Sequence, residues 1–151
     1  MDFMEEALQE AYEGIQKKHG GPFGSVVVKD NRIVGRGHNR VLLKKDPTCH
    51  GEMEAIRDAC QNLGTHDLSG CELYTTAEPC PMCLGGILWA NIAKVYYGCN
   101  CQDTAEIGFR DDAFYDFLKG DGRALQLEEW RREQCLELFE TYQKDKKNLR
   151  Y

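Results

Sequence analysis

Residues 71–98 read CELYTTAEPCPMCLGGILWANIAKVYYG, and the order of their apolar segments decides the fold class. CELYTTA predicts a buried strand, MCLGGILWA predicts a short helix, and AKVYYG predicts a second strand. Because a helix separates the two strands, they should pair in parallel within a layered domain. We therefore expect an α/β fold with helices on both faces of a mixed sheet.

The segments upstream supply further elements of the same domain. FMEEALQEAYEGI at 3–15 has apolar residues at helical spacing and ends before two glycines. GSVVVKDNRIVGRGH at 24–38 carries two β-branched runs around an Asp-Asn pair, which predicts an antiparallel hairpin. GEMEAIRDACQNLG at 51–64 predicts an amphipathic helix that stops at its final glycine.

The last third of the sequence is less regular. CNCQDTAEIGFRDD at 99–112 reads as a loop, and a short apolar segment follows at 114–118. A C-terminal helix is expected from about residue 128 to residue 144. With no internal repeat and no low-complexity linker, residues 1–151 should form a single domain.

Composition narrows the classes of function. The chain has 151 residues, of which 42% are hydrophobic, enough for one domain with a core. No apolar segment approaches ~20 residues and no signal peptide is evident, so we expect a soluble cytoplasmic protein without membrane association. The net charge of -6 argues against nucleic-acid binding and favours a small neutral substrate. In a reducing cytosol, the eight cysteines should serve metal binding or burial.

Two motifs combine into a candidate zinc site. AEPCPMCLGG places Cys80 and Cys83 in a C-x-x-C pair, and CHGEMEAI places His50 two residues before Glu52. Two thiolates and one imidazole can hold Zn²⁺ and leave the fourth tetrahedral position for water, as in catalytic sites. Zinc lowers the pKa of such a water towards ~7. We expect His50, Cys80 and Cys83 as metal ligands and Glu52 as the catalytic residue that carries protons.

Two alternative interpretations include a bound zinc ion but assign it no catalytic role. Cys80, Cys83, Cys99 and Cys101 could form a four-cysteine structural site, which would leave the spacing of the histidine and glutamate motif unexplained. Alternatively, the domain could be a zinc-stabilised interaction module without catalytic activity. Glu52 argues against that reading, because a structural site needs no proton carrier.

The H-x-E motif followed by P-C-x-x-C is the signature of the zinc-dependent nucleobase deaminases. The sequence resembles that family over nearly its whole length, including the leading helix, the GGPFG turn and the HN pair after the second predicted strand. The resemblance implies a three-layer α/β/α cytidine-deaminase-like fold with a mixed five-stranded sheet. It also implies hydrolytic deamination of a small-molecule nucleobase.

Residues beyond these motifs bear on the substrate. TAEIGFRDD, an aromatic-rich segment and a C-terminal tyrosine are similar to bacterial guanine deaminases and plant guanosine deaminases. This similarity implies conversion of guanine to xanthine and ammonia. It also implies that Asn39, Asp111 and Tyr151 hold the purine, with Asp112 as the match if the alignment is gapped by one residue.

Two aromatic residues are candidates for the walls around a bound ring. Phe23 and Trp89 offer flat apolar faces, although core packing explains either residue equally well. The HGE sequence departs from the His-Ala-Glu usual in guanine enzymes and, with GHN, also occurs in fungal cytosine deaminase. Cytosine, isocytosine, guanosine and transfer RNA adenosine therefore remain alternative substrates.

In the guanine deaminases that the chain resembles, the C-terminal segment crosses to the partner subunit. The resemblance therefore implies a homodimer in which residues from about 128 to 151 are exchanged and Tyr151 completes the partner's site. A chain end without any role is the alternative.

Overall fold

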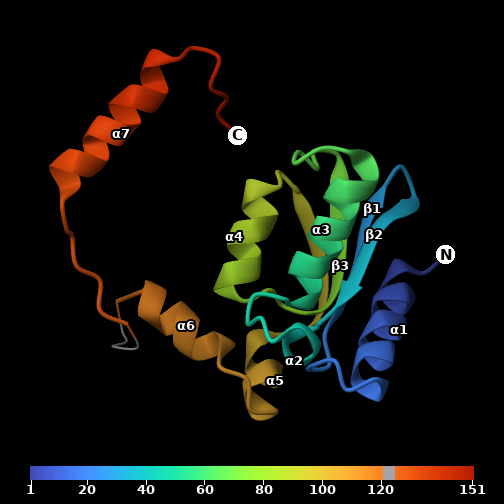
Figure 1. Ribbon diagram of the computed structural model, residues 1–151. Helices are drawn as coiled ribbons and strands as arrows, with labels where there is room; N and C mark the ends of the chain where they lie inside the picture. The colour runs from blue at the N-terminus through green and yellow to red at the C-terminus, as the bar shows by residue number, and fades with distance from the viewer. Residues whose placement is uncertain (121–124) are drawn as a thin grey trace.

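The computed structural model describes residues 1–120 and 125–151, and its centre is a four-stranded mixed sheet in the order β2-β1-β3-β4 (Figure 1). The strands are β1 (Gly24–Lys29), β2 (Arg32–His38), β3 (Cys71–Ala77) and β4 (Lys94–Cys99). β1 is antiparallel to both of its neighbours, whereas β3 and β4 are parallel. The predicted hairpin and the predicted parallel pair are both confirmed.

The hairpin turn follows from the residues that form it. Asp30 and Asn31 have φ angles of 49° and 62°, and this left-handed conformation is what a two-residue hairpin turn requires. Asp and Asn tolerate it better than other residues with side chains. The turn brings Lys29 opposite Arg32 and sets the register of the two strands.

Helices cover both faces of the sheet, as expected. Helix α1 (Phe3–Gln16) lies on one face, and α3 (Gly51–Leu63) and α4 (Pro81–Trp89) lie on the other (Figure 1). Val26 and Val28 pack in the cluster that contains Phe3, whereas Val27 packs in the cluster that contains Ala55. Alternate strand residues point to opposite faces, so a run of valines fits a strand that is covered on both sides.

Two glycines allow α3 to lie very close to β2. A Cβ atom on Gly35 would be 2.5 Å from the Ala55 carbonyl oxygen, and one on Gly37 would be 2.6 Å from the Ala55 nitrogen. Both contacts involve helix backbone, which cannot move aside as a flexible side chain could. The close packing fixes the position of α3, and therefore of its N-terminal end, where His50 is the N-cap.

The loop expected over 99–112 is largely helical, which corrects the sequence interpretation. It contains α5 (Cys101–Glu106) and the start of α6 (Asp111–Leu118). Asn100 accepts a hydrogen bond from the Asp103 N–H, and Asp103 accepts one from the Asn100 N–H. This capping box starts a helix in a polar sequence with little apolar periodicity. A short helix, α2 (Val41–Lys44), was also not foreseen.

Within residues 1–120 and 125–151, the sheet has four strands instead of the five expected. After β4 the chain enters α5 at the capping box of Asn100, and no described residue beyond β4 adds a strand to the edge of the sheet. The C-terminal helix, α7 (Arg132–Lys144), starts four residues later than expected. None of the helices in the described residues combines the length and apolar character needed to cross a bilayer.

Candidate zinc-dependent active site

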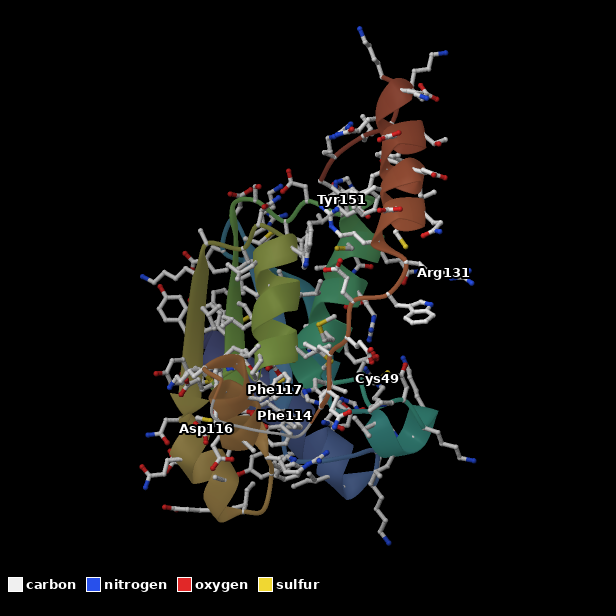
Figure 2. All side chains as sticks on the ribbon, turned by 90° about the vertical axis from the view of Figure 1, so that its left-hand side faces the viewer. Cys49, Phe114, Asp116, Phe117, Arg131 and Tyr151 are labelled. Carbon is white, nitrogen blue, oxygen red and sulfur yellow. The ribbon has the colours of Figure 1, made fainter. Side chains whose placement is uncertain are left out.

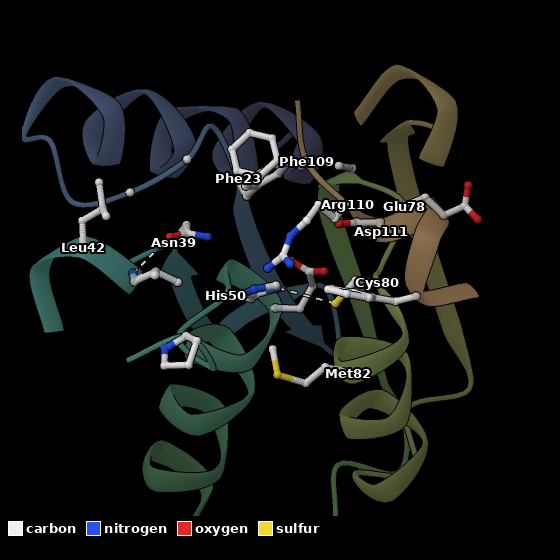
Figure 3. A pocket seen from close by; sticks show the side chains of 17 residues that line it. Phe23, Asn39, Leu42, His50, Glu78, Cys80, Met82, Phe109, Arg110 and Asp111 are labelled. Atoms are coloured by element: carbon white, nitrogen blue, oxygen red, sulfur yellow. Dashed lines mark hydrogen bonds between the residues drawn. The ribbon is translucent and has the colours of Figure 1, made fainter. Parts of the chain in front are cut away.

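The two motifs meet because two helices begin at the same edge of the sheet. His50 is the N-cap of α3, and Cys80 is the N-cap of α4 with Pro81 at the first helical position (Figure 3). Proline fits this position, because its missing N–H would have no partner in the helix anyway. Helix N-termini carry partial positive charge, which stabilises a nearby thiolate or carboxylate.

The three predicted ligands converge. His50 Nδ1 lies 3.5 Å from Cys80 Sγ and 3.5 Å from Cys83 Sγ, and the donor atoms of the group all lie within 4.8 Å of one another. A tetrahedral zinc ion with ordinary bond lengths places its nitrogen and sulfur ligands about 3.5 Å apart. Both the donor types and their spacing therefore fit zinc.

The two thiols differ in their readiness to ionise. Contact with Cys83 and with His50 lowers the pKa of Cys80 to about 4, although burial opposes this shift. Contact with Cys80, followed by burial, raises the pKa of Cys83. Their contact therefore favours the thiolate at Cys80 and the thiol at Cys83, whereas a bound divalent cation would favour the thiolate at both.

Glu52 lies in the first turn of α3 and reaches the same space. Its side chain is buried, and this burial raises its pKa to about 7 in the absence of a cation. It belongs to the cavity lining but not to the group of metal donors. A carboxyl group with a pKa in this range can both accept and return a proton near neutral pH.

A cavity of about 600 Å³ opens over these residues (Figure 3). Six predicted site residues line it, namely Phe23, Asn39, His50, Glu52, Cys80 and Asp111. Eleven lining residues were not foreseen: Gly20, Gly21, Val41, Leu42, Pro47, Ala77, Glu78, Met82, Phe109, Arg110 and Phe114. Glu78 lies two residues before Cys80, and Met82 directly precedes Cys83. Their nearness to the predicted ligands could have identified them as lining residues from the sequence.

The orientation of the Asn39 amide is fixed from outside the cavity. Its Oδ1 accepts a hydrogen bond of 3.0 Å from the Val41 N–H, so the Nδ2 donor faces the cavity (Figure 3). Asn39 is buried, and its own N–H donates to the Phe23 carbonyl. The side chain therefore presents a donor to whatever occupies the cavity.

An aromatic wall comes from two distant parts of the chain. The rings of Phe23 and Phe109 pack edge to face, with centroids 4.9 Å apart and an interplanar angle of 81°. Such an arrangement is favourable and holds both rings in place. The wall explains why the segment around Phe109 matters to the site although it was expected to be a loop.

The structure distinguishes the two candidate aspartates. Asp111 begins α6, lines the cavity and has its pKa raised mainly by burial. Asp112 is exposed, and its carboxylate accepts a hydrogen bond from the Ala113 N–H. Only Asp111 is placed to contact a bound molecule in this cavity.

Two other candidates lie outside the cavity of their own chain. Trp89 ends α4 and is 67% exposed. A rise of about 1.5 Å per residue puts it about 13 Å along the helix axis from Cys80, too far to form a wall. Tyr151 is 79% exposed, and the centroid of its ring lies 6.0 Å from that of Trp89. In Figure 2, Tyr151 lies toward the top of the view, whereas Phe114 of the cavity lies lower.

Comparison with known proteins agrees with this geometry. The model of the cytidine and deoxycytidylate deaminase zinc-binding region matches residues 1–99. The chain belongs to this family. Its N-terminal two thirds therefore form a zinc-binding deaminase domain, in agreement with the His50, Cys80 and Cys83 donor set.

Individual relatives extend the similarity. The guanine deaminase of Bacillus subtilis (strain 168) is 49% identical over 113 residues, 75% of this chain and 72% of that protein. The X-ray structure of guanine deaminase from Bacillus subtilis superposes with a TM-score of 0.94 at 38% identity and covers 100% of this chain and 99% of that one. The tRNA-specific adenosine deaminase of Aquifex aeolicus is 44% identical over 95 residues, 63% of this chain and 62% of that protein.

The first prediction concerns the metal. Zinc-loaded protein should contain about one zinc ion per chain, and Cys83→Ala should lose it, because two donors hold zinc poorly. Cys101→Ala is the matched control, since this half-buried cysteine lies outside the donor group and should leave the zinc content unchanged. Metal analysis after dialysis measures both. Loss of zinc by Cys101→Ala, together with full zinc content in His50→Ala, would establish the four-cysteine site instead.

Proposed function

We propose that this protein hydrolyses the 2-amino group of free guanine and releases xanthine and ammonia. The observation that carries the proposal is the extent of the similarity to guanine deaminase. The superposition on the guanine deaminase structure covers the whole chain with a TM-score of 0.94, whereas the superposition on a tRNA:A34 deaminase structure covers 65% of it with a TM-score of 0.63. The shared zinc-binding region ends at residue 99, and Phe109, Arg110, Asp111 and Phe114 of the cavity lie beyond it.

The cavity suits a flat ring that carries both donors and acceptors. Phe23 and Phe109 offer apolar surface to the ring. Asn39 presents a donor, which fits a ring nitrogen or the 6-oxo group of guanine. Asp111 presents a carboxylate that can accept from a ring N–H or an amino group. A cavity of about 600 Å³ has ample room for one purine base.

The residues of the chain divide the chemical work. A zinc ion held by His50, Cys80 and Cys83 supplies, when bound, a water molecule of lowered pKa. Glu52 would accept two protons in turn, one from the attacking water and one from the hydroxyl group that it leaves on C2, and would pass the first to a ring nitrogen and the second to the departing amino group. One water is consumed and one ammonia is released, so the reaction balances.

We further propose that the protein is a homodimer with exchanged C-terminal segments. Tyr151 lies outside the cavity of its own chain, and α7 keeps Leu138 and Phe139 at 66% and 64% exposed. Helix α7 extends away from the sheet and its covering helices (Figure 1). Exposed apolar side chains on such a segment fit burial against a second copy.

The second prediction tests the reaction. Zinc-loaded protein should release ammonia from guanine faster than from guanosine, cytosine, isocytosine, cytidine or adenine. Glu52→Gln should keep its zinc and fold but lose at least ~100-fold in kcat, the usual contribution of a positioned acid or base. Ammonia release at matched zinc content measures both effects. A faster reaction with another base, or near-normal turnover of Glu52→Gln, would contradict the proposal.

The third prediction tests substrate contacts. Asn39→Ala and Asp111→Ala should each lower kcat/KM for guanine about 5- to 150-fold, because a buried hydrogen-bond partner is left unpaired. Zinc content should not change, since neither residue belongs to the donor group. Asp112→Ala is the control and should behave like the wild type, because this residue is exposed. A severe effect of Asp112→Ala with a mild effect of Asp111→Ala would reverse the assignment.

The fourth prediction tests the exchange of C-terminal segments. Glu52→Gln protein has an inactive site and an intact tail, and protein that lacks Tyr151 has an intact site and no tyrosine. If the tail acts on the partner, each mixed dimer gains one complete site, and random exchange of equal amounts restores ~25% of wild-type activity. A mixture no more active than its components would exclude the exchange. Full activity of the protein that lacks Tyr151 would show that the tyrosine is dispensable.

A further inference from the structure

A chain of three hydrogen-bonded side chains lies behind the cavity and has no part in the proposed chemistry. Glu10 of α1 contacts His38 at the end of β2, with 2.9 Å between Oε2 and Nδ1. His38 Nε2 lies 2.8 Å from Nδ1 of His19, in the segment after α1. Glu10 and His38 are buried, and His19 is half-buried.

These contacts restrict where the imidazole protons lie. The Glu10 carboxylate accepts a hydrogen bond, so His38 donates from Nδ1. A second hydrogen bond joins His38 Nε2 and His19 Nδ1, one of which donates while the other accepts. Burial, followed by the proximity of His38, lowers the pKa of His19, so His19 is neutral at neutral pH.

His19, at one end of this series of hydrogen-bonded side chains, is joined to the cavity wall. The His19 carbonyl accepts hydrogen bonds of 3.0 Å and 3.1 Å from the N–H groups of Leu42 and Leu43, at the start of α2. Leu42 lines the cavity. The next residue, Gly20, lies so close to Asn39 that a Cβ atom there would be 2.0 Å from Asn39 Oδ1. A displacement of His19 would therefore move the residues that hold the Asn39 amide.

The near end is equally constrained. His38 directly precedes Asn39, and its ring packs against Gly14, where a Cβ atom would lie 2.7 Å from His38 Cδ2. Glycine at this position of α1 leaves room for the ring to reach Glu10. A buried polar chain of this kind specifies one geometry only while every member is satisfied.

We propose that Glu10, His38 and His19 are positioning residues for substrate binding, which together hold Gly20, α2 and the Asn39 amide in the orientation that recognises the base. The proposal rests on the proposed function, because it assigns the three residues to the same cavity. If Asn39 contacts the substrate equally in the ground state and in the transition state, loss of the anchor raises KM and leaves kcat unchanged.

A pair of variants at His19 tests the positioning role. His19→Leu removes the hydrogen-bond partner of His38 Nε2 and should raise KM for guanine about tenfold, while kcat stays within about twofold and zinc content is unchanged. His19→Gln keeps an N–H donor at this position and should recover most of the lost affinity. Glu13→Gln is the control, because Glu13 is an exposed residue of α1 that pairs with Lys17. A wild-type KM in His19→Leu, or no recovery in His19→Gln, would overturn the proposal.

A measurement on the wild-type protein tests the hydrogen-bond chain without substitution. The chain has four histidines, so ¹⁵N-histidine labelling gives four imidazole spin systems, and the spectra of His19→Gln and His38→Gln assign the two of interest. His38 should carry a proton on Nδ1, the nitrogen that faces Glu10. A proton on Nε2 of His38 with a bare Nδ1 would overturn the proposal. Failure of the wild type to deaminate guanine would instead overturn the proposed function, and the tautomers would still decide whether the hydrogen-bond chain exists.

Discussion

The convergence of one imidazole nitrogen and two thiol sulfurs at the starts of α3 and α4 is the constraint on which the rest of the site depends. The 3.5 Å distances from His50 Nδ1 to Cys80 Sγ and Cys83 Sγ require α3 and α4 to begin side by side at the same edge of the sheet. The parallel pairing of β3 and β4 places α4, and the glycine contacts between β2 and α3 place α3. Since packed elements hold side chains more precisely than loops do, an ion site of this kind needs the three-layer framework.

The chain divides between a zinc-binding framework and a cavity wall that lies partly beyond it. Residues 1–99 match the zinc-binding region and carry all three donor residues together with Glu52. The residues beyond this region contribute an aromatic ring and two charged side chains to the cavity, namely Phe109, Arg110 and Asp111. Under the proposed function, one such framework can serve several aminated bases, and residues of the wall contribute to the choice among them.

The sequence predicted those parts of the structure whose physics is local. Asp30 and Asn31 predicted the hairpin, and periodic apolar residues predicted α1 and α3. The spacing of the histidine and cysteine motifs predicted the metal-donor group. Helix α5 escaped because its start depends on a reciprocal cap between Asn100 and Asp103, which was readable but is a weaker signal than periodicity.

Other features depend on packing over long sequence distances and could not be read from one segment. The contact between Phe23 and Phe109 joins residues 86 positions apart, and no pattern in either segment specifies it. Trp89 looked like a candidate wall because tryptophan is common around flat ligands, but its position depends on the length of α4. The chain Glu10, His38 and His19 was missed for the same reason, since its members come from three separate elements.

Under the proposed function, selectivity follows from which groups around the ring donate hydrogen bonds and which accept them. Asn39 and Arg110 offer donors, whereas Asp111 and Glu52 offer carboxylate oxygens as acceptors. Guanine has acceptors at its 6-oxo group and ring nitrogens and donors at N1 and the 2-amino group, so each type of group has a counterpart. Adenine carries an amino group at C6 and no hydrogen on N1, which would set donor against donor and leave an acceptor unpaired. The apolar contacts that all purines share cancel in this comparison, and each unpaired buried polar group costs about 1–3 kcal/mol, so such mismatches would favour guanine over adenine.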